Sequence, residues 1–185
     1  MASETELSDF LRSAERRAFK RCLYHVRDEE AALDIVQDSM MKLAQHYGDK
    51  PPAELPLLFQ RILSNCIQDW FRRQKSQRAL FSNLSEFELP EEADPLEFLP
   101  GALEEWGSES AEDATGRNQT LELLESLIKQ LPDRQREAFL LRYWEEMDVA
   151  ETAAVMGCSQ GSVKTHCFRA VQSLSKSLRD QGFST

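Results

Sequence analysis

The stretch that decides the fold covers residues 131–178 and reads LPDRQREAFLLRYWEEMDVAETAAVMGCSQGSVKTHCFRAVQSLSKSL. Its apolar residues recur at three- and four-residue spacing, which predicts helices. Two of these helices meet at Gly157, where a turn needs a positive φ that any residue with a Cβ adopts only at a cost. The stretch therefore predicts a helix followed by a helix-turn-helix.

Capping residues locate both helices of the helix-turn-helix. Asp148 and Glu151 have the spacing of a capping box, in which Asp148 accepts from an amide of the first turn and Glu151 from the Asp148 amide, so the first helix begins near Val149. Ser159 fits as the N-cap of the second helix. On that second helix the three-and-four spacing predicts a buried stripe, made of Val163, Cys167, Ala170, Val171 and Leu174.

The other side of this second helix is the candidate DNA-reading surface. A short helix with a polar face fits the major groove of DNA, and Lys164 and Arg169 suit phosphate or guanine contacts. Helical hairpins with a glycine turn also occur in many all-helical proteins that bind no DNA, so this pattern alone leaves both interpretations open. The candidate readers are Ser162, Lys164, Thr165, His166, Phe168 and Arg169.

Upstream of this stretch the chain shows further helical patterns and no strand-rich region, so we expect an all-α fold. Asp28 is a candidate N-cap, and Gly48 with three nearby prolines predicts a break after the second helix. The predicted helices span residues 10–26, 29–47, 57–77 and 120–130. The inner side of the second is expected to carry Ala32, Ile35, Val36, Met40, Leu43 and Ala44.

Charge is segregated along the chain. The formal net charge is −10, but residues 82–116 contain eleven Asp or Glu residues and no Lys or Arg. This composition, with its prolines and glycines, predicts an acidic linker between two small helical domains, 1–81 and 117–185. Basic residues cluster in both domains, as phosphate contact requires: Arg61, Arg72, Arg73, Lys75 and Arg78 in the first, and Lys164, Arg169, Lys176 and Arg179 in the second.

Motifs of catalysis, metal binding and membrane insertion are missing from the sequence. No P-loop, GxGxxG run, nucleophile elbow or HExxH is present, so we expect no enzyme activity and no cofactor. No apolar run reaches the length of a membrane span and the first residues are acidic, so we expect a cytoplasmic protein without membrane insertion. Four cysteines without CxxC spacing predict free buried thiols and no metal: Cys22, Cys66, Cys158 and Cys167.

The 131–178 stretch resembles the C-terminal promoter-binding domain of bacterial sigma factors. In that domain LPxRQREAFLLRYWE is followed by an apolar helix, a glycine and SxGSVKxxxxRA. The resemblance implies that residues 159–170 read the minus-35 promoter element as duplex DNA. It also implies that the preceding helix, which carries Arg134, Arg136 and Arg142, meets the flap of RNA polymerase. His166 stands where Arg is frequent in this family, and Cys167 where Leu or Ile is frequent.

Two upstream segments resemble the N-terminal conserved domain of the same family. They read ALDIVQDSMMKLAQHY (32–47) and LPLLFQRILSNCIQDWFRRQKS (55–76), with the VQDxxxxL and RIxxNxxxDWxRR signatures. Both domains match in the expected order, and the short chain resembles the minimal extracytoplasmic-function (ECF) group. The resemblance implies a non-catalytic initiation factor that joins core RNA polymerase, directs it to specific promoters and assists strand opening.

The resemblance also implies a polymerase-binding face on the predicted helix at 29–47, which contains the first of these two segments. In the family this helix docks on the clamp helices of the largest polymerase subunit, whereas a solvated charged face is the alternative for the residues taken alone. The candidate polymerase-binding residues are Asp34, Gln37, Asp38 and Met41.

The helix in the 55–76 segment and the loop before it, at 48–56, correspond to the family's minus-10 site. This site captures a base flipped from the melted non-template strand, because rings stack on unpaired bases while Arg neutralises phosphates. A core aromatic is the alternative interpretation of Trp70. The candidate minus-10 residues are Arg61, Asn65, Asp69, Trp70, Arg72 and Arg73.

The partners expected from the resemblance are core RNA polymerase and promoter DNA, both as duplex and as melted strand. Members of this family are commonly held inactive by an anti-sigma factor, which makes such a protein a candidate partner. A stand-alone helix-turn-helix regulator that binds duplex DNA without polymerase is the alternative function. Only the sigma interpretation accounts for the two upstream segments.

Overall fold

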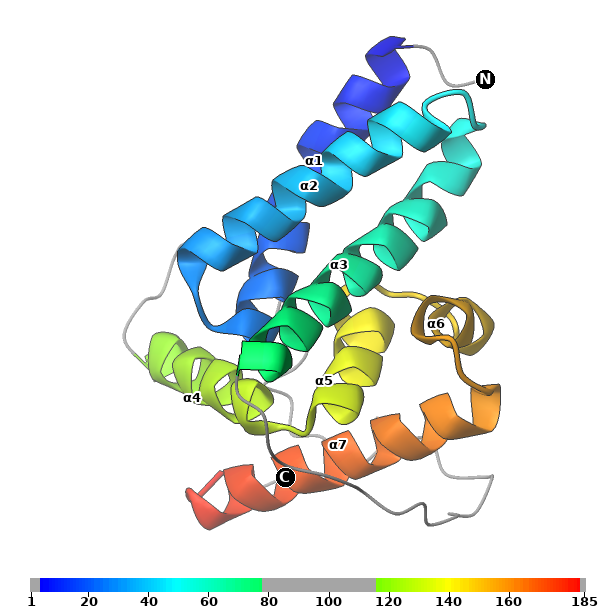
Figure 1. Ribbon diagram of the computed structural model, residues 1–185. Helices are drawn as coiled ribbons and strands as arrows, with labels where there is room; N and C mark the ends of the chain where they lie inside the picture. The colour runs from blue at the N-terminus through cyan, green and yellow to red at the C-terminus, as the bar shows by residue number, and fades with distance from the viewer. Residues whose placement is uncertain (1–3, 78–115, 184–185) are drawn as a thin grey trace. The chain divides into compact units, whose positions relative to one another are not determined.

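The computed structural model describes residues 4–77 and 116–183. All regular structure in these residues is helical, which confirms the predicted fold class, and the helices form two compact units (Figure 1). The first unit is built on α1 (Glu4–Val26), α2 (Glu29–Tyr47), the 3-10 turn η1 (Pro52–Glu54) and α3 (Leu55–Gln77). The second described range, 116–183, contains α4 (Gly116–Gln130), α5 (Asp133–Phe139), the π-helical turn η4 (Leu140–Trp144), α6 (Val149–Met156) and α7 (Gln160–Asp180).

The acidic linker predicted for residues 82–116 lies outside the described residues, apart from Gly116, where α4 begins. The side chain of Lys75 and the whole of Arg78, both counted in the first basic cluster, lie outside them as well.

Helix α2 agrees with its predicted bounds, and its N-cap is the one expected. The side chain of Asp28 accepts a hydrogen bond from the Ala31 amide at 2.8 Å. Three helices begin earlier than predicted: α1 at Glu4, α3 at Leu55 and α4 at Gly116. In α1 the apolar stripe already includes Leu7, which packs against the core of the first unit.

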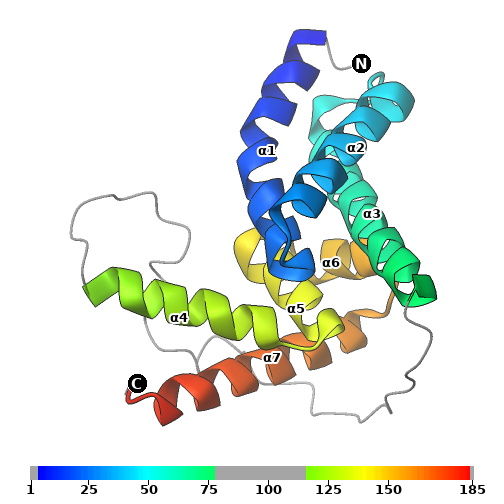
Figure 2. The same cartoon turned by 60° about the vertical axis from the view of Figure 1, so that its left-hand side comes forward.

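The first unit is a three-helix bundle in which α1, α2 and α3 all contact one another (Figures 1 and 2). Phe10 of α1 meets Phe59 of α3 edge to face, with ring centroids 5.8 Å apart. Burial of such apolar surface is the main stabilising contribution to a small helical domain. The core consists of Ala18, Cys22, Val26, Ala32, Ile35, Val36, Leu43, Leu55, Phe59, Leu63, Cys66 and Ile67.

One detail of this core differs from the expected pattern. Ala44 of α2 is exposed rather than inward-facing, because Leu43 and Ile35 define the buried side of the helix. At the start of α3, Leu55 and Phe59 are fully buried, whereas Leu58 and Ile62 are half-buried. A helix with apolar residues on more than one side does not reveal from sequence alone which of them the neighbouring helices cover.

A charged side chain lies inside the first unit. Arg21 of α1 is fully buried. Its guanidinium donates to Gln60 Oε1 at 2.5 Å and to the hydroxyl of Ser64, both on α3. These two acceptors lie one helical turn apart, so a single side chain joins α1 to α3 over a full turn.

In the second unit α7 packs against both α4 and α5 (Figure 2). The buried side of α7 confirms the predicted stripe, which Ser175 and Leu178 extend toward the C-terminus. The segment from α4 to η4 adds further buried apolar residues to this unit: Leu124, Ile128, Leu131, Ala138, Phe139, Leu140, Leu141 and Trp144.

Arg136 is a structural residue rather than part of an exposed surface. It is buried, and its guanidinium donates to the backbone carbonyls of Ile128, Lys129 and Leu131 at 3.2, 3.0 and 2.5 Å. The same group pairs with Asp133 at 3.2 Å. The last carbonyls of a helix lack partners within that helix, so Arg136 satisfies the end of α4 and fixes α5 to it.

A π-helical turn follows α5, and a residue in a strained backbone conformation lies two positions after its end. The guanidinium of Arg142 donates to the carbonyl of Met147 across the turn, and Glu146 adopts a left-handed conformation with φ of 56°. This conformation is costly for a residue with a Cβ. The turn at Leu140–Trp144 thereby directs the chain into α6.

Candidate nucleic-acid interface

The helix-turn-helix is formed by α6 and α7, and its local geometry confirms the predicted capping. The Asp148 amide donates to Glu151 Oε2 at 3.0 Å, and the Glu151 amide donates to Asp148 Oδ1 at 2.7 Å. Gly157 takes a φ of 64° at the turn. The Ser159 hydroxyl then caps α7 by accepting from the Ser162 amide at 3.1 Å.

The predicted DNA-reading residues all lie on the first half of α7, outside its buried stripe. Lys164 is exposed, and the other five side chains are half-buried. Successive residues of a helix are about 100° apart. Ser162, Thr165 and Arg169 therefore lie on the side opposite the buried stripe, while Lys164 and His166 flank that side.

His166 occupies the most unusual environment of this set. Burial lowers the pKa of its imidazole, and the positive charges of Arg134 and Arg169 lower it further. Its Nδ1 atom is buried and has no hydrogen-bond partner among the described residues. The ring therefore stays neutral near pH 7 between two cationic side chains. Arg134 was not among the predicted readers, and no local pattern in the sequence places α5 beside α7.

The predicted minus-10 residues follow one another along α3. Arg61, Asn65, Arg72 and Arg73 are exposed, and Asp69 pairs with Arg72 at 3.2 Å. This helix presents cations together with polar side chains that have donors and acceptors. Such a surface suits a nucleic-acid strand better than it suits a packed interior.

Trp70 has features both of a core aromatic residue and of a surface ring that could stack on a base, the two interpretations made from the sequence. It packs against the core of the first unit, yet it remains half-buried rather than buried. Its ring meets Phe71 edge to face, with centroids 5.0 Å apart and an interplanar angle of 81°. The indole is therefore held in one orientation while part of it reaches the surface.

The predicted polymerase-binding residues on α2 are all exposed. Met41 is 58 % exposed, and Leu33, which was not among the predicted residues, is a second exposed hydrophobic residue at 47 %. Leu33, Gln37 and Met41 follow a four-residue spacing, so the helical period could have revealed this stripe. Exposed apolar side chains beside acidic ones are typical of a protein-binding surface.

Asp38 on this face forms an ion pair with Lys42 and accepts a hydrogen bond from Cys66. Lys42 Nζ lies 2.7 Å from Asp38 Oδ2. The hydrogen bond from Lys42 lowers the pKa of Asp38, and the same bond raises the pKa of Lys42. Because α2 and α3 pack together, the structure also brings Asp38 to Cys66 Sγ, at 3.6 Å, next to the predicted minus-10 residue Asn65.

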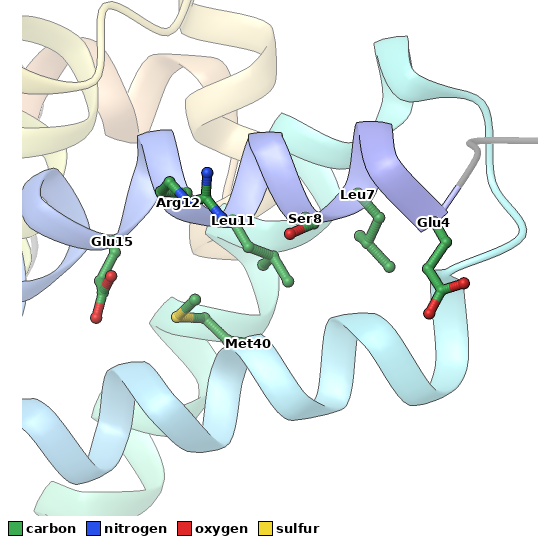
Figure 3. A pocket seen from close by; sticks show the side chains of 7 residues that line it. All are labelled: Glu4, Leu7, Ser8, Leu11, Arg12, Glu15 and Met40. Carbon is green, nitrogen blue, oxygen red and sulfur yellow. The ribbon is translucent and has the colours of Figure 1, made fainter.

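A groove of about 380 Å³ lies between α1 and α2 (Figure 3). Leu7, Leu11 and Met40 provide its apolar surface, and charged side chains line its edges. It holds no pairing of a nucleophile with a base and is not formed by the predicted site residues. Within the described ranges no group of three His, Cys, Asp or Glu side chains is placed to hold a metal ion.

The cysteines are free thiols, as predicted, and Cys22, Cys66 and Cys167 are buried. Cys158 is only half-buried because it follows Gly157 in the exposed turn. Burial raises the pKa of the Cys167 thiol to about 12. In the part of the chain that the structure describes, no helix is long and apolar enough to cross a bilayer.

Comparison with known proteins gives a consistent picture. A family model described as "Sigma-70, region 4" matches residues 121–174. The RNA polymerase sigma-E factor of Streptomyces antibioticus is 31 % identical over 159 residues, which cover 83 % of this chain and 73 % of that protein. The ECF RNA polymerase sigma factor SigM of Bacillus subtilis is 25 % identical over 165 residues, covering 89 % of each chain.

A solved structure shares the fold. It is the sigma factor RpoE of Bartonella quintana in complex with the anti-sigma factor NepR, with a TM-score of 0.59 and 20 % sequence identity. The match covers 92 % of this chain and 97 % of that chain. The arrangement of helices is therefore similar to one already found in a solved protein.

Proposed function

This chain belongs to the extracytoplasmic-function (ECF) sigma factors of bacterial RNA polymerase, and we propose that it directs core polymerase to specific promoters and assists strand opening. The observation that carries the proposal is that one chain contains both a helix-turn-helix, on α6 and α7, and a cationic, partly aromatic surface, on α3. It acts through binding energy and strand capture, so no catalytic residue and no cofactor are required. As a transcription factor it works in the cytoplasm.

In this proposal the minus-35 element is bound as duplex by α7. In the first half of the helix the side opposite the buried stripe is not covered by the core, as insertion of that side into the major groove requires. Lys164 is exposed and flanks the outward side, which suits a phosphate contact. Thr165 and Arg169 lie nearer the centre of that side and suit base edges. Ser162, His166 and Phe168 complete the surface.

The minus-10 element is bound by α3 as a melted strand. The exposed arginines Arg61, Arg72 and Arg73 neutralise phosphates, and Asn65 offers an amide to a base edge. Trp70, held edge to face by Phe71 and near Asp69, offers a ring for stacking. Extruding a base into such a surface couples sequence recognition to melting.

Core polymerase is bound through α2. Leu33 and Met41 supply apolar contact area, and Asp34, Gln37 and Asp38 supply polar contacts around it. We assign residues 1–81 to polymerase and minus-10 binding and residues 117–185 to minus-35 binding, joined by the acidic segment 82–116. An anti-sigma factor is proposed as a further partner, one that covers these surfaces when the factor is inactive.

The decisive experiment is co-purification with core RNA polymerase followed by run-off transcription on fragmented genomic DNA. Retention of polymerase and promoter-dependent transcripts are expected. Duplex binding without either result would favour a stand-alone helix-turn-helix regulator instead. Met41→Asp places a charge on the apolar stripe of α2 and should abolish retention of polymerase. Ser13→Asp adds the same charge at an exposed position of α1 and is the matched control.

Two further variants separate the DNA contacts. Lys164→Ala should weaken binding to all duplexes alike and reduce the slope of log K against log salt by about 0.9, the value for one phosphate contact. Asn65→Ala should leave polymerase and duplex binding unchanged while lowering strand opening, measured by the fluorescence of a base analogue in the minus-10 element. An Asn65→Ala protein that opens promoters normally would remove Asn65 from the site.

A further inference from the structure

Three side chains from two facing helices form a small ring around the sulfur of Cys66. Lys42 Nζ on α2 donates a hydrogen bond to Cys66 Sγ on α3 at 3.4 Å. The thiol in turn donates to Asp38 Oδ2 at 3.6 Å, and Lys42 Nζ lies 2.7 Å from the same oxygen. A nucleophilic amine and an oxidisable sulfur are therefore in direct contact.

The ring lies at the edge of the α2–α3 seam. Cys66 is 7 % exposed, whereas the side chains of Lys42 and Asp38 are 43 % and 55 % exposed. A molecule as small as hydrogen peroxide can reach a sulfur in this position, while a bulky thiol cannot approach it in line. Oxidation of Cys66 is therefore expected to be resolved by a group already beside it.

We propose that hydrogen peroxide joins Cys66 to Lys42 through a sulfur–nitrogen bond, which cross-links α3 to α2. Peroxide first takes two electrons from the sulfur, converting the thiol to a sulfenic acid and releasing one water. The neutral amine of Lys42 then attacks the sulfur. The S–N bond forms, the S–O bond breaks, and the oxygen leaves as a second water. One proton, lost from the ammonium, passes to solvent.

Geometry favours this amine over any group in solution. Reacting atoms held about 3–3.5 Å apart gain a large advantage over a bimolecular encounter, and the Lys42 nitrogen already lies 3.4 Å from the sulfur. A sulfenic acid is known to condense with a backbone nitrogen in proteins, and a neutral lysine amine is a stronger nucleophile than a backbone amide. The same contact that stabilises the reduced ring thus supplies the partner for the oxidised one.

The charges around the ring determine how the reaction depends on pH. The hydrogen bond to Asp38 raises the pKa of Lys42, and Arg73 adds a further positive charge on the α3 side of Asp38. The amine is therefore mostly protonated near neutral pH. Because only the neutral amine attacks sulfur, the yield of the S–N bond should increase as the pH rises toward the pKa of Lys42.

Peptide mapping of the full-length protein after peroxide treatment tests the proposal. The digest should contain one peptide pair joined between Lys42 and Cys66, lighter by two hydrogens than the two separate peptides. Dithiothreitol should release it, and the yield should be greater at about pH 9 than at about pH 7, because more lysine is neutral. This test uses no polymerase or DNA, so its outcome is independent of the proposed function.

Three variants sharpen the experiment. Lys42→Arg keeps a positive charge beside the sulfur but should eliminate the joined peptide, as should Cys66→Ser. Cys158→Ser, at the half-buried cysteine of the turn, is the matched control and should leave the joined peptide unchanged. Recovery of wild-type Cys66 only as thiol, sulfinic acid or sulfonic acid would overturn the proposal. A joined pair that retains the oxygen atom would overturn the condensation step, and the wild-type map alone decides both points.

Discussion

Asp148 and Glu151 each satisfy the backbone amide of the other, at 3.0 and 2.7 Å, and together they fix the first residue of α6. The first amides of a helix have no partner within the helix, so each bond removes an unsatisfied donor. Because α6 has only two turns, a large share of its stability depends on this end.

Replacement of Asp148 by Ala should therefore destabilise the protein by about 1 kcal/mol, the usual cost of removing an N-cap. The midpoint of urea unfolding, followed by circular dichroism, measures the loss. Glu151→Gln keeps an oxygen acceptor for the Asp148 amide and should cost less than half as much. Equal midpoints for Asp148→Ala and wild type would show that the box contributes nothing to stability.

Gly157→Ala should cost about 1–2 kcal/mol, the penalty for a Cβ in the left-handed region. The penalty is purely conformational, because a Cβ at this position would meet nothing within 4 Å. Gly161→Ala is the matched control, because its Cβ would meet only the Ser159 hydroxyl at 3.9 Å. That variant should be neutral or slightly more stable, since Ala favours helix over Gly. Thermal unfolding of both variants tests the contrast.

Arg136→Met should destabilise the second unit by about 3 kcal/mol or more, because it leaves several buried carbonyls without donors. Met preserves much of the volume, so loss of packing contributes little. Chemical unfolding should show the loss, and protease digestion should detect earlier opening around α4. Arg134→Met, at a half-buried position three residues from the paired Glu137, is the comparison and should cost clearly less. Similar losses for both variants would contradict the role given to Arg136.

His166 should make minus-35 binding dependent on pH. Burial and two arginines lower its pKa, so the ring is neutral near pH 7 and gains a proton only below its ordinary value of 6.5. DNA phosphates favour the charged form, so affinity for duplex should increase as pH falls from about 8 to about 5. Fluorescence anisotropy at constant salt measures this, with His166→Gln expected to remove the slope and His166→Arg to raise affinity throughout.

The same residue has the opposite effect on stability. The unfolded chain takes up the proton more readily than the folded chain, because the pKa of His166 is lower in the folded state. The contribution of His166 to stability is therefore complete above pH 6.5 and is lost as pH falls below it. His166→Gln should flatten this part of the stability profile, and an unchanged profile would show that other groups cause it.

Much of the helix-turn-helix could be predicted because its determinants act within a few residues of one another. The capping pair at Asp148, the positive φ of Gly157 and the cap at Ser159 all depend on adjacent backbone, and all three are confirmed. The buried stripe of α7 follows from the helical period in the same way.

Features that depend on contacts between distant residues were not predictable. The sequence pattern does not distinguish Arg136 from Arg134 and Arg142, yet Arg136 is buried because the carbonyls at the end of α4 accept its hydrogen bonds. The π-helical turn has no local signature, and the sequence does not place Arg134 beside His166. In the candidate site the α2 residues are exposed, whereas on α3 Asp69 and Trp70 are half-buried. The sequence pattern alone does not give this difference, because it depends on how α3 packs against its neighbours.

Arg21 determines more than local stability. Its guanidinium needs both Gln60 and Ser64, and these residues are the only acceptors found for it in the described chain. A slide of α1 along α3 by one turn, about 5.4 Å, would leave a positive charge among apolar side chains. Leucines and alanines alone would tolerate several such alignments. The buried arginine thus selects one alignment of α1 on α3, the helix that carries the proposed minus-10 residues.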